Sequence, residues 1–448
     1  GNTAFALRLP WALLGAITVP VVFALATRLK GLTLGLMTAV LLATYHYHIH
    51  FSRLGINNAA DPFFAALALL FLYRGYDRRS ALDWALCGVV TGVAQYFYFG
   101  ARSIPIILAI LVASFVIREG KQFWHEQRLN VLILVGAAII SAAPMIQYAL
   151  RFPADYNARL PLVGVFQSGW LEREQVIRNQ GPIPILLDQV RRAALAFNAY
   201  PDTTTWYGRP QPLFDFAAGV LFLLGLGYAT IRLDDRRLLP MVVWWWIPVI
   251  IGGALTTETP ASQRLIAVAP PAIFFVAFAL TRIGELFQQA WASRERLTLA
   301  PYLTAAVLVL SLTSVRWYFT DFTPTYRYGS FNGLVATRLA HYAKDELGPE
   351  WRIYFFGPPR MYIGYGTIPY LAPEVGGVDV PQPLTAPPDA SFAPPDKNAA
   401  FVFLPERLPE LEWVRQAFPA GEVEELASPL GGDALFIVYR VPRGQPPQ

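Results

Sequence analysis

The chain has 448 residues, of which 54% are hydrophobic and only 15% charged, with a mean hydropathy of +0.38. A soluble protein carries about 25% charged residues, so this composition excludes an ordinary soluble domain and favours a polytopic membrane protein. The net charge of +5 does not indicate nucleic-acid binding, because the basic residues fall in short loops between apolar segments. The single cysteine, Cys87, excludes an internal disulfide and a cysteine-based metal site.

Apolar stretches follow one another along the first 319 residues, and we predict a polytopic α-helical membrane protein with about ten transmembrane helices. An untilted span needs about 20 residues, so the shorter stretches have soft boundaries, and one or two fit re-entrant segments as well. The predicted spans are 7–29, 31–46, 60–74, 80–99, 103–117, 129–150, 213–232, 238–256, 262–281 and 299–318.

Basic residues are distributed unevenly between the two sets of loops that join these spans. One set holds fourteen lysines and arginines, whereas the short loops of the other set hold only three arginines. Positive residues stay on the cytoplasmic side, so the first set is predicted to be inside. Residues 46–59, the loop 151–212 and the tail beyond residue 319 are then extracytoplasmic, in a plasma membrane of the bacterial type.

The loop 151–212 is too long for a simple connection and contains an amphipathic stretch, GPIPILLDQVRRAALAF. Pro182 and Pro184 mark the start of the helix that this pattern predicts. We expect the helix to lie at the membrane interface, with its apolar side in lipid and with Arg191 and Arg192 toward the headgroups. A helix packed on the bundle explains the pattern equally well.

The composition changes after residue 319. FNGLVATRLAHYAKDEL and LPELEWVRQAF are predicted to be helices, and RIYFFG, AAFVFLPE and ALFIVYRV are predicted to be strands. We therefore expect a membrane domain over 1–319, including the loop 151–212, and a small extracytoplasmic α/β domain over 320–448. No glycine-rich phosphate loop, metal spacing or nucleophile motif occurs in the tail, so its expected role is structural or in acceptor recognition.

Polar residues gather where the third predicted span begins, in the stretch FSRLGINNAADPFF. Asp61 and Pro62 are typical of a helix N-cap and of the first helical position, so a purely structural role explains both. That role does not account for Arg53, Asn57 and Asn58 in the same short loop. Ionisable groups at membrane depth are functional candidates, so Asp61 is a candidate catalytic carboxylate and its neighbours are candidates for substrate binding.

Three histidines, His46, His48 and His50, precede this stretch. On a helix, His46 and His50 share a face, with a spacing that zinc could use. No third ligand is evident nearby, so no residue is assigned to a metal. A divalent cofactor is left open.

Three arginines open or precede predicted spans at one membrane face: Arg8, Arg53 and Arg264, the last of which follows Glu258 in its loop. Snorkelling to lipid headgroups is the usual explanation for an isolated arginine there. Three guanidinium groups at one face suit a phosphate, because guanidinium binds phosphate oxygens in a bidentate manner. We predict that these arginines surround a lipid phosphate, with Glu258 beside them.

Three segments, ALRLPWALLGAITVPVVFALATRLKG, FSRLGINNAADPFFAALALLFLYRG and ETPASQRLIAVAPPAIFF, together resemble C-type glycosyltransferases. The similarity is to relatives of the protein O-mannosyltransferases and of the lipid A aminoarabinose transferase, and it covers most of residues 1–320. It implies a multispan enzyme that moves a sugar from a polyprenyl-phosphate donor to an acceptor on the outer face, with inversion at the anomeric carbon. The acceptor would be a protein, a lipid or a glycan.

The resemblance also implies roles for individual residues. Asp61 matches the second acidic position of the family, Arg264 matches an arginine near the donor site, and Arg8 matches one at the start of the family's second helix. The main catalytic carboxylate of the family lies in a first outer loop that has no counterpart here, because residue 7 already lies in what would be the second helix. We therefore expect these 448 residues to be N-terminally incomplete and inactive as they stand.

Other functions share some of these features. A transporter or flippase of lipid-linked sugars would favour polar residues at mid-span, whereas here they collect at one face. A polymerase or ligase of lipid-linked glycans would share the donor, and a catalytically silent scaffold is a further alternative. The glycosyltransferase is favoured, with a lipid-linked donor, an acceptor and membrane lipid as its partners. No nucleotide is needed, in agreement with the lack of a P-loop or dinucleotide fingerprint.

Overall fold

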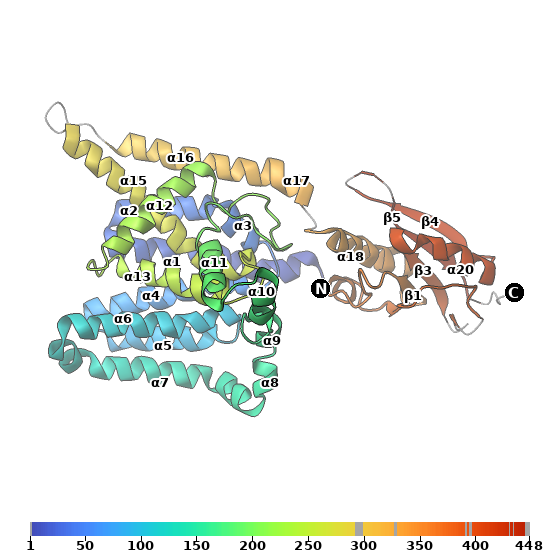
Figure 1. Cartoon of the computed structure of the whole chain (residues 1–448), viewed down its shortest axis with the longest axis horizontal. Helices are drawn as coiled ribbons and strands as arrows, with labels where there is room; N and C mark the ends of the chain where they lie inside the picture. The colour runs from blue at the N-terminus through green and yellow to red at the C-terminus, as the bar shows by residue number, and fades with distance from the viewer. Residues whose placement is uncertain are drawn as a thin grey trace. The chain divides into compact units, whose positions relative to one another are not determined.

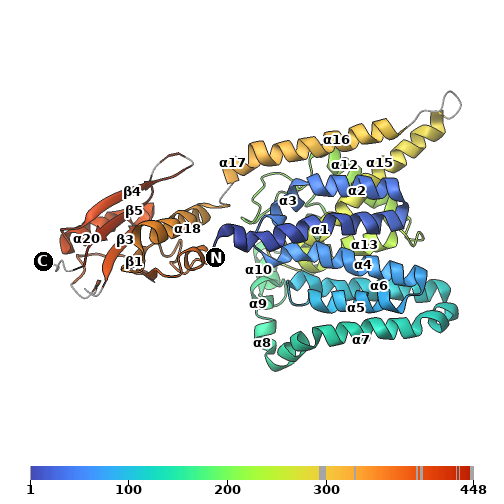
Figure 2. The same cartoon turned by 180° about the vertical axis from the view of Figure 1, so that it is seen from behind.

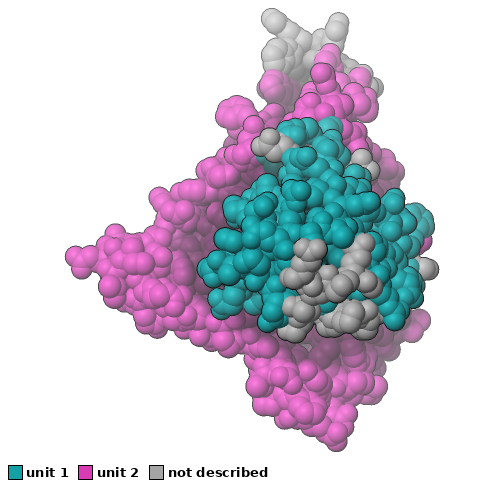
Figure 3. Space-filling view, turned by 90° about the vertical axis from the view of Figure 1, so that its right-hand side faces the viewer, with its two compact units in different colours: residues 1–7, 322–448 teal, residues 8–321 magenta. Residues whose placement is uncertain are grey.

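The computed structural model describes residues 2–291, 299–326, 329–389, 392–393, 397–429, 431–432 and 434–443. The chain divides into two compact units, which Figure 3 shows in different colours. The membrane unit is Arg8–Asp321, and the sheet unit combines Gly1–Leu7 with Phe322–Gln448. Each unit is described by itself.

The membrane unit is built of helices, and its long helices lie side by side in Figure 1 and in the reverse view of Figure 2. The long helices are α1 (Ala4–Lys30), α2 (Leu32–Thr44), α4 (Asp61–Arg78), α5 (Ala81–Ala94), α6 (Ser103–Glu119), α7 (Lys121–Arg151), α12 (Phe216–Ile231), α13 (Leu239–Pro248), α15 (Ala269–Trp291) and α16 (Ala300–Arg316). The shorter elements are α3 (His46–Ser52), η1 (Asn57–Ala60), η2 (Phe99–Arg102), α8 (Pro153–Tyr156), α9 (Leu160–Val163), α10 (Trp170–Arg178), α11 (Pro182–Ala194), η3 (Val249–Ala254), α14 (Ser262–Leu265), η4 (Ile266–Val268) and η5 (Trp317–Phe322).

Each of the ten predicted spans overlaps one of these helices. Among the described residues, five helices are long and apolar enough to cross a membrane, and a sixth is added if α2 and α3, bent by 59°, form one span. The five are Ala4–Lys30, Phe99–Glu119, Lys121–Arg151, Ser262–Ala290 and Ala300–Tyr326. Three further apolar helices, Ala81–Ala94, Phe216–Ile231 and Leu239–Ala254, are shorter. The structure is therefore a multispan helical protein, and ten crossings stay a prediction.

Helices α5 and α7 pack closely against each other, and two glycines make this possible. A Cβ atom on Gly88 would lie 2.2 Å from the carbonyl oxygen of Leu134, and one on Gly92 would lie 2.6 Å from that of Ala138. Small residues four apart allow two membrane helices to approach to backbone contact. Most of α7 is otherwise exposed, so this seam holds it to the bundle.

We expect Gly92→Leu to separate α7 from α5 and to lower the free energy of unfolding by about 1–3 kcal/mol, the usual cost of overpacking. Denaturant titration of the detergent-solubilised protein measures this loss. The matched control is Gly136→Leu on α7, because no atom lies within 4 Å of a Cβ placed there. Equal stability of the two variants would contradict the assigned seam.

The sheet unit is a mixed five-stranded sheet in the order β2-β1-β3-β5-β4. Strand β1 is parallel to β2 and β3, whereas β5 is antiparallel to β3 and β4. Its strands are β1 (Trp351–Phe356), β2 (Gly376–Asp379), β3 (Asn398–Phe403), β4 (Glu422–Ala427) and β5 (Ala434–Val441). Its helical elements are α17 (Thr323–Tyr326), α18 (Phe331–Tyr342), η6 (Ala343–Leu347), α19 (Thr367–Leu371), η8 (Pro405–Glu410) and α20 (Leu411–Ala417).

Successive side chains of β1 point to opposite faces of the sheet, so β1 contributes to the hydrophobic core on each face. Ile353 and Phe355 join a core with Leu339 of α18, whereas Tyr354 and Phe356 join another with Val414 of α20. The α/β class, the two helices and the three apolar strands predicted from the sequence are confirmed. Strands β2 and β4 were not predicted: β2 is four residues long and begins with two glycines, and β4 carries three glutamates.

Candidate functional site

The segment between α7 and α12 folds over one end of the helix bundle, and α11 is its main anchor. Ile185, Gln189 and Ala193 of α11 are buried, and Gln189 donates from Nε2 to the carbonyl oxygen of Thr256 at 3.0 Å. The helix packed on the bundle, one of the two readings of the sequence, is therefore confirmed. Leu187 on the same helix is 63% exposed, so insertion of that side into lipid stays a prediction.

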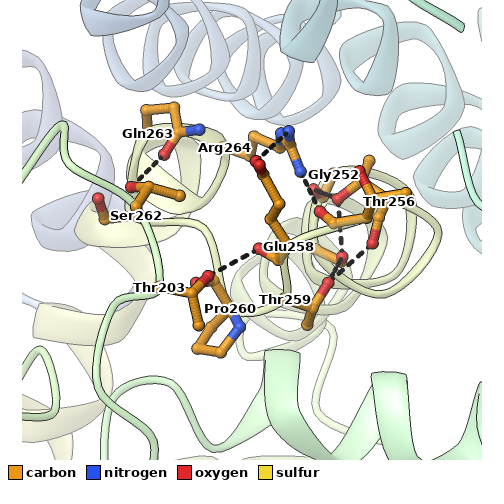
Figure 4. Close-up of polar contacts among 12 residues, drawn as sticks. Thr203, Gly252, Thr256, Glu258, Thr259, Pro260, Ser262, Gln263 and Arg264 are labelled. Carbon is orange, nitrogen blue, oxygen red and sulfur yellow. Dashed lines mark hydrogen bonds and ion pairs between the residues drawn. The ribbon is translucent and has the colours of Figure 1, made fainter. Parts of the chain in front are cut away.

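A second link comes from Asp202, whose carboxylate binds the start of α14. Its Oδ1 accepts from the backbone N–H of Ser262 at 3.0 Å, and its Oδ2 accepts from the Ser262 hydroxyl at 2.6 Å. The loop before α14 is held further by Thr203, whose hydroxyl donates to the carbonyl oxygen of Glu258 at 3.1 Å (Figure 4). These bonds fix the position of Arg264, two residues further along the chain.

A cavity of about 210 Å³ lies between these elements. It is enclosed by η2 and the first turn of α6, by the α9 segment and by η3. Its lining residues are Tyr98, Phe99, Gly100, Ser103, Arg159, Leu160, Val163, Gly164, Phe166, Gln167, Pro248, Ile251, Gly252, Leu255, Thr256, Arg264 and Ala267. Two arginines and no carboxylate are among them, so the cavity suits an anionic group attached to an apolar one.

Arg264 is bonded to two residues of its own loop. Its Nη1 donates to the carbonyl oxygen of Thr257, and its Nη2 lies 3.5 Å from Oε2 of Glu258 (Figure 4). The Arg264 side chain is only 9% exposed, whereas that of Glu258 is 66% exposed. Water screens an ion pair with so exposed a carboxylate, so Glu258 neutralises Arg264 only weakly.

Asp61 lies behind the wall of this cavity. It is buried, its Oδ1 has no hydrogen-bond partner in the described part of the chain, and a Cβ on Gly100 would stand 2.1 Å from its Oδ2. The predicted N-cap role is wrong: Ala60 is the N-cap of α4, and Asp61 is its first helical residue. A buried carboxylate without a partner is costly, so a structural role does not explain it.

The charges of Arg264, Asp61 and Arg159 all act on the side chain of Tyr98. It lies in the turn between α5 and η2, and burial raises the pKa of its phenol. The positive charges of Arg264 and Arg159 lower this pKa, whereas the negative charge of Asp61 raises it further. Four polar side chains from four segments therefore interact electrostatically next to the cavity.

The other predicted substrate-binding residues lie outside the cavity lining. Arg8 and Arg53 are close enough for their charges to act on each other, and Nη1 of Arg53 lies 3.5 Å from the hydroxyl of Tyr318. Asn57 donates from Nδ2 to the carbonyl oxygen of Phe97 at 2.7 Å. Arg8 and Arg53 thus form a second basic group, and one phosphate held by all three predicted arginines stays a prediction.

Asn58 borders the site from the η1 side. Its Nδ2 donates to the carbonyl oxygen of Gln263 at 2.5 Å, next to Arg264 in sequence. Its Oδ1 is buried and has no hydrogen-bond partner in the described ranges. The amide therefore fixes the approach of η1 to α14, and Asp61 follows it by one helical turn.

The three histidine side chains form hydrogen bonds with other groups of the protein. His46 bonds through Nδ1 to the hydroxyl of Tyr207 and through Nε2 to Nη1 of Arg209, each at 2.6 Å. His50 bonds to the carbonyl oxygen of Trp206 at 2.9 Å. Within the described ranges, no three His, Cys, Asp or Glu side chains are grouped as ligands of one metal ion.

Together these features define a multispan helical membrane protein with a mixed sheet unit and a basic cavity at one end of its bundle. Residues 1–148 match the family described as dolichyl-phosphate-mannose-protein mannosyltransferase. The fold is similar to that of ArnT from Cupriavidus metallidurans, both in the apo state and bound to undecaprenyl phosphate. Both structures have a TM-score of 0.54, are 14% and 13% identical to this chain, and match 97% of it and 83% of their own length.

An apo oligosaccharyltransferase from Archaeoglobus fulgidus matches 88% of this chain and 55% of its own, with 15% identity and a TM-score of 0.47. No curated protein sequence matches the chain. The resemblance to C-type glycosyltransferases is confirmed by the family match over the first 148 residues and by the fold shared with ArnT.

Proposed function

We propose that this protein is a membrane glycosyltransferase that takes a sugar from a polyprenyl-phosphate donor and transfers it to an acceptor. The observation that carries the proposal is the cavity lined by Arg159 and Arg264, with the unpartnered carboxylate of Asp61 behind its wall. The family match and the ArnT-like fold support the same reaction class, and one of the similar structures was solved with undecaprenyl phosphate bound.

The two arginines bind the phosphate that joins the sugar to the lipid. Guanidinium groups form charge-assisted, bidentate hydrogen bonds with phosphate oxygens. No carboxylate lines the cavity, and Glu258 is too exposed to neutralise Arg264 fully. The apolar side chains of Leu160, Val163 and Ile251 receive the first prenyl units, since they line the same cavity.

The reaction is a single displacement at the anomeric carbon. The acceptor hydroxyl forms the new C–O bond as the bond to the phosphate oxygen breaks, so the configuration inverts. The leaving phosphate keeps the electron pair and gains negative charge, which the two guanidinium groups stabilise. The carboxylate of Asp61 receives the proton of the acceptor hydroxyl, since its Oδ2 lies beside Gly100, which lines the cavity.

The site faces the extracytoplasmic side in this proposal. What supports this orientation is the charge bias of the loops, since the fourteen basic residues of one set would be cytoplasmic. The sheet unit then also lies outside, where it contacts the acceptor. Arg8 and Arg53 assist entry of the lipid phosphate.

Binding of a prenyl phosphate tests the role of the cavity. A charge-assisted hydrogen bond contributes about 1.5–3 kcal/mol, so Arg264→Gln and Arg159→Gln are each expected to weaken binding of farnesyl phosphate by about 10-fold or more. Equilibrium binding to the purified protein in detergent measures the change, with inorganic phosphate and farnesol as competitors.

The matched control is Arg173→Gln on α10. Arg173 donates to the carbonyl oxygen of Ser168 and does not line the cavity, so this variant should bind like the wild type. If the double variant Arg159→Gln/Arg264→Gln keeps wild-type affinity while it stays folded, the cavity is not the donor site.

A further inference from the structure

A second recess lies between α5, α7 and the start of α6. It has a volume of about 470 Å³ and shares no lining residue with that cavity. Its floor is formed by Thr91 and Gly92 of α5, and its wall by Ala142, Ile146 and Ala149 of α7. We call it the lateral groove.

The groove runs along α7, which is long and apolar enough to cross a membrane, and beside the shorter apolar helix α5. Only 11% of the apolar window of α7 is buried within the protein, so its remaining side chains face the surroundings. Gly92, which lets α7 approach α5, also lines the groove. An apolar groove beside a helix of membrane-spanning length suits a hydrocarbon chain.

One end of the groove is polar and lies next to a positive charge. Tyr156 and Asn157 line that end, and Arg102 is bound to both: its Nη2 donates to the Tyr156 carbonyl oxygen at 3.1 Å, and its Nη1 lies 3.5 Å from Oδ1 of Asn157. The guanidinium also lies 4.0 Å and 3.8 Å from the ring centroids of Phe99 and Tyr156. The two aromatic rings hold the plane of the Arg102 guanidinium group and do not neutralise its charge.

Arg102 has no carboxylate partner among the described residues within ion-pair distance. A rigid, uncompensated guanidinium at the end of an apolar groove complements a phosphate that carries a hydrocarbon chain. We propose that the lateral groove binds an anionic phospholipid, with one acyl chain along α7 and the phosphate at Arg102. This site is additional to the donor cavity and does not depend on it.

The test is lipid retention by the delipidated protein in detergent, measured by native mass spectrometry with phosphatidylglycerol or phosphatidylcholine of equal chain length. The wild type should retain phosphatidylglycerol preferentially. Arg102→Gln should reduce that preference by about 10-fold, the value of one charge-assisted hydrogen bond, whereas Arg102→Lys should keep part of it. Ala149→Phe should reduce retention of both lipids, because it fills the groove while leaving the charge.

The matched control is Arg316→Gln, which removes an exposed arginine from the end of another apolar helix, α16. If Arg316→Gln and Arg102→Gln have the same effect, the preference is general electrostatics and the proposal fails. Unchanged retention in Ala149→Phe would also overturn it.

Two competitors separate the sources of the phosphate. Inorganic phosphate should not displace phosphatidylglycerol, since the acyl chain contributes to binding. Displacement by inorganic phosphate alone would reduce the site to an anion site and overturn the lipid assignment. Farnesyl phosphate should compete no better in the wild type than in Arg159→Gln/Arg264→Gln. If it displaces the lipid only when those arginines are present, the groove is part of the donor site and the proposal is wrong.

Discussion

Asp61→Asn is expected to lower sugar transfer by at least about 100-fold, because a positioned general base contributes about 10²–10⁴-fold to a reaction. Asparagine has nearly the shape of aspartate but cannot take the proton of the acceptor hydroxyl. Transfer of labelled sugar from a prenyl phosphate in membrane vesicles measures the loss.

The same substitution separates catalysis from a structural role. Asparagine keeps the size of the side chain and its ability to form hydrogen bonds, so a residue with a purely structural role would tolerate the change. The matched control is Asp77→Asn on the other end of α4, where Asp77 pairs with Arg28 at 3.0 Å and is 43% exposed. It should keep near wild-type transfer. Wild-type transfer by Asp61→Asn would remove Asp61 from the mechanism.

Arg407→Ala is expected to destabilise the sheet unit by about 3–5 kcal/mol, because it leaves a buried carboxylate unpaired. Arg407 and Glu410 are 8% and 7% exposed, and Nη2 of Arg407 donates to Oε2 of Glu410 at 2.8 Å. Nη1 of Arg407 also donates to the carbonyl oxygens of Pro358 and Val380, at 2.9 and 3.0 Å. The pair therefore joins the loops that follow β1, β2 and β3.

Hydrogen exchange of the β1 and β3 amides in the intact chain measures this loss of stability. Arg360→Ala is the control: Arg360 pairs with Glu406 at the surface, where an ion pair contributes less than about 1 kcal/mol. Replacing both buried partners, in Arg407→Met/Glu410→Leu, should recover much of the stability, since no charge is left unpaired. Unchanged exchange in Arg407→Ala would show that the pair contributes little.

Helices were the most predictable part of the fold, because an apolar run of sufficient length has few alternatives. The span predicted to start at residue 103 is α6, which begins at Ser103, and the predicted strand RIYFFG overlaps β1. The N-cap assignment of Asp61 failed because a 3-10 turn, η1, precedes α4 and moves the cap to Ala60. Such turns leave no periodic signal in the sequence.

The site was only partly predictable. Asp61 and Arg264 were selected because ionisable residues next to apolar spans are costly; Arg264 lines the cavity, and Asp61 lies behind its wall. Tyr98, Gly100 and Arg159 were missed. Arg159 belongs to a long loop whose path depends on tertiary contacts such as the bond from Gln189 to Thr256, and no pattern in the sequence specifies that contact.

The most direct measurement of the central claim is the position of the bound donor lipid. A prenyl phosphate with a photoactivatable group near the phosphate can be crosslinked to the protein in vesicles and the adducts mapped by mass spectrometry. We expect adducts in residues 160–167 and 251–256, and their loss in Arg159→Gln/Arg264→Gln. Adducts confined to the region of Arg8 and Arg53, or adducts that persist without Arg159 and Arg264, would contradict a donor site in this cavity.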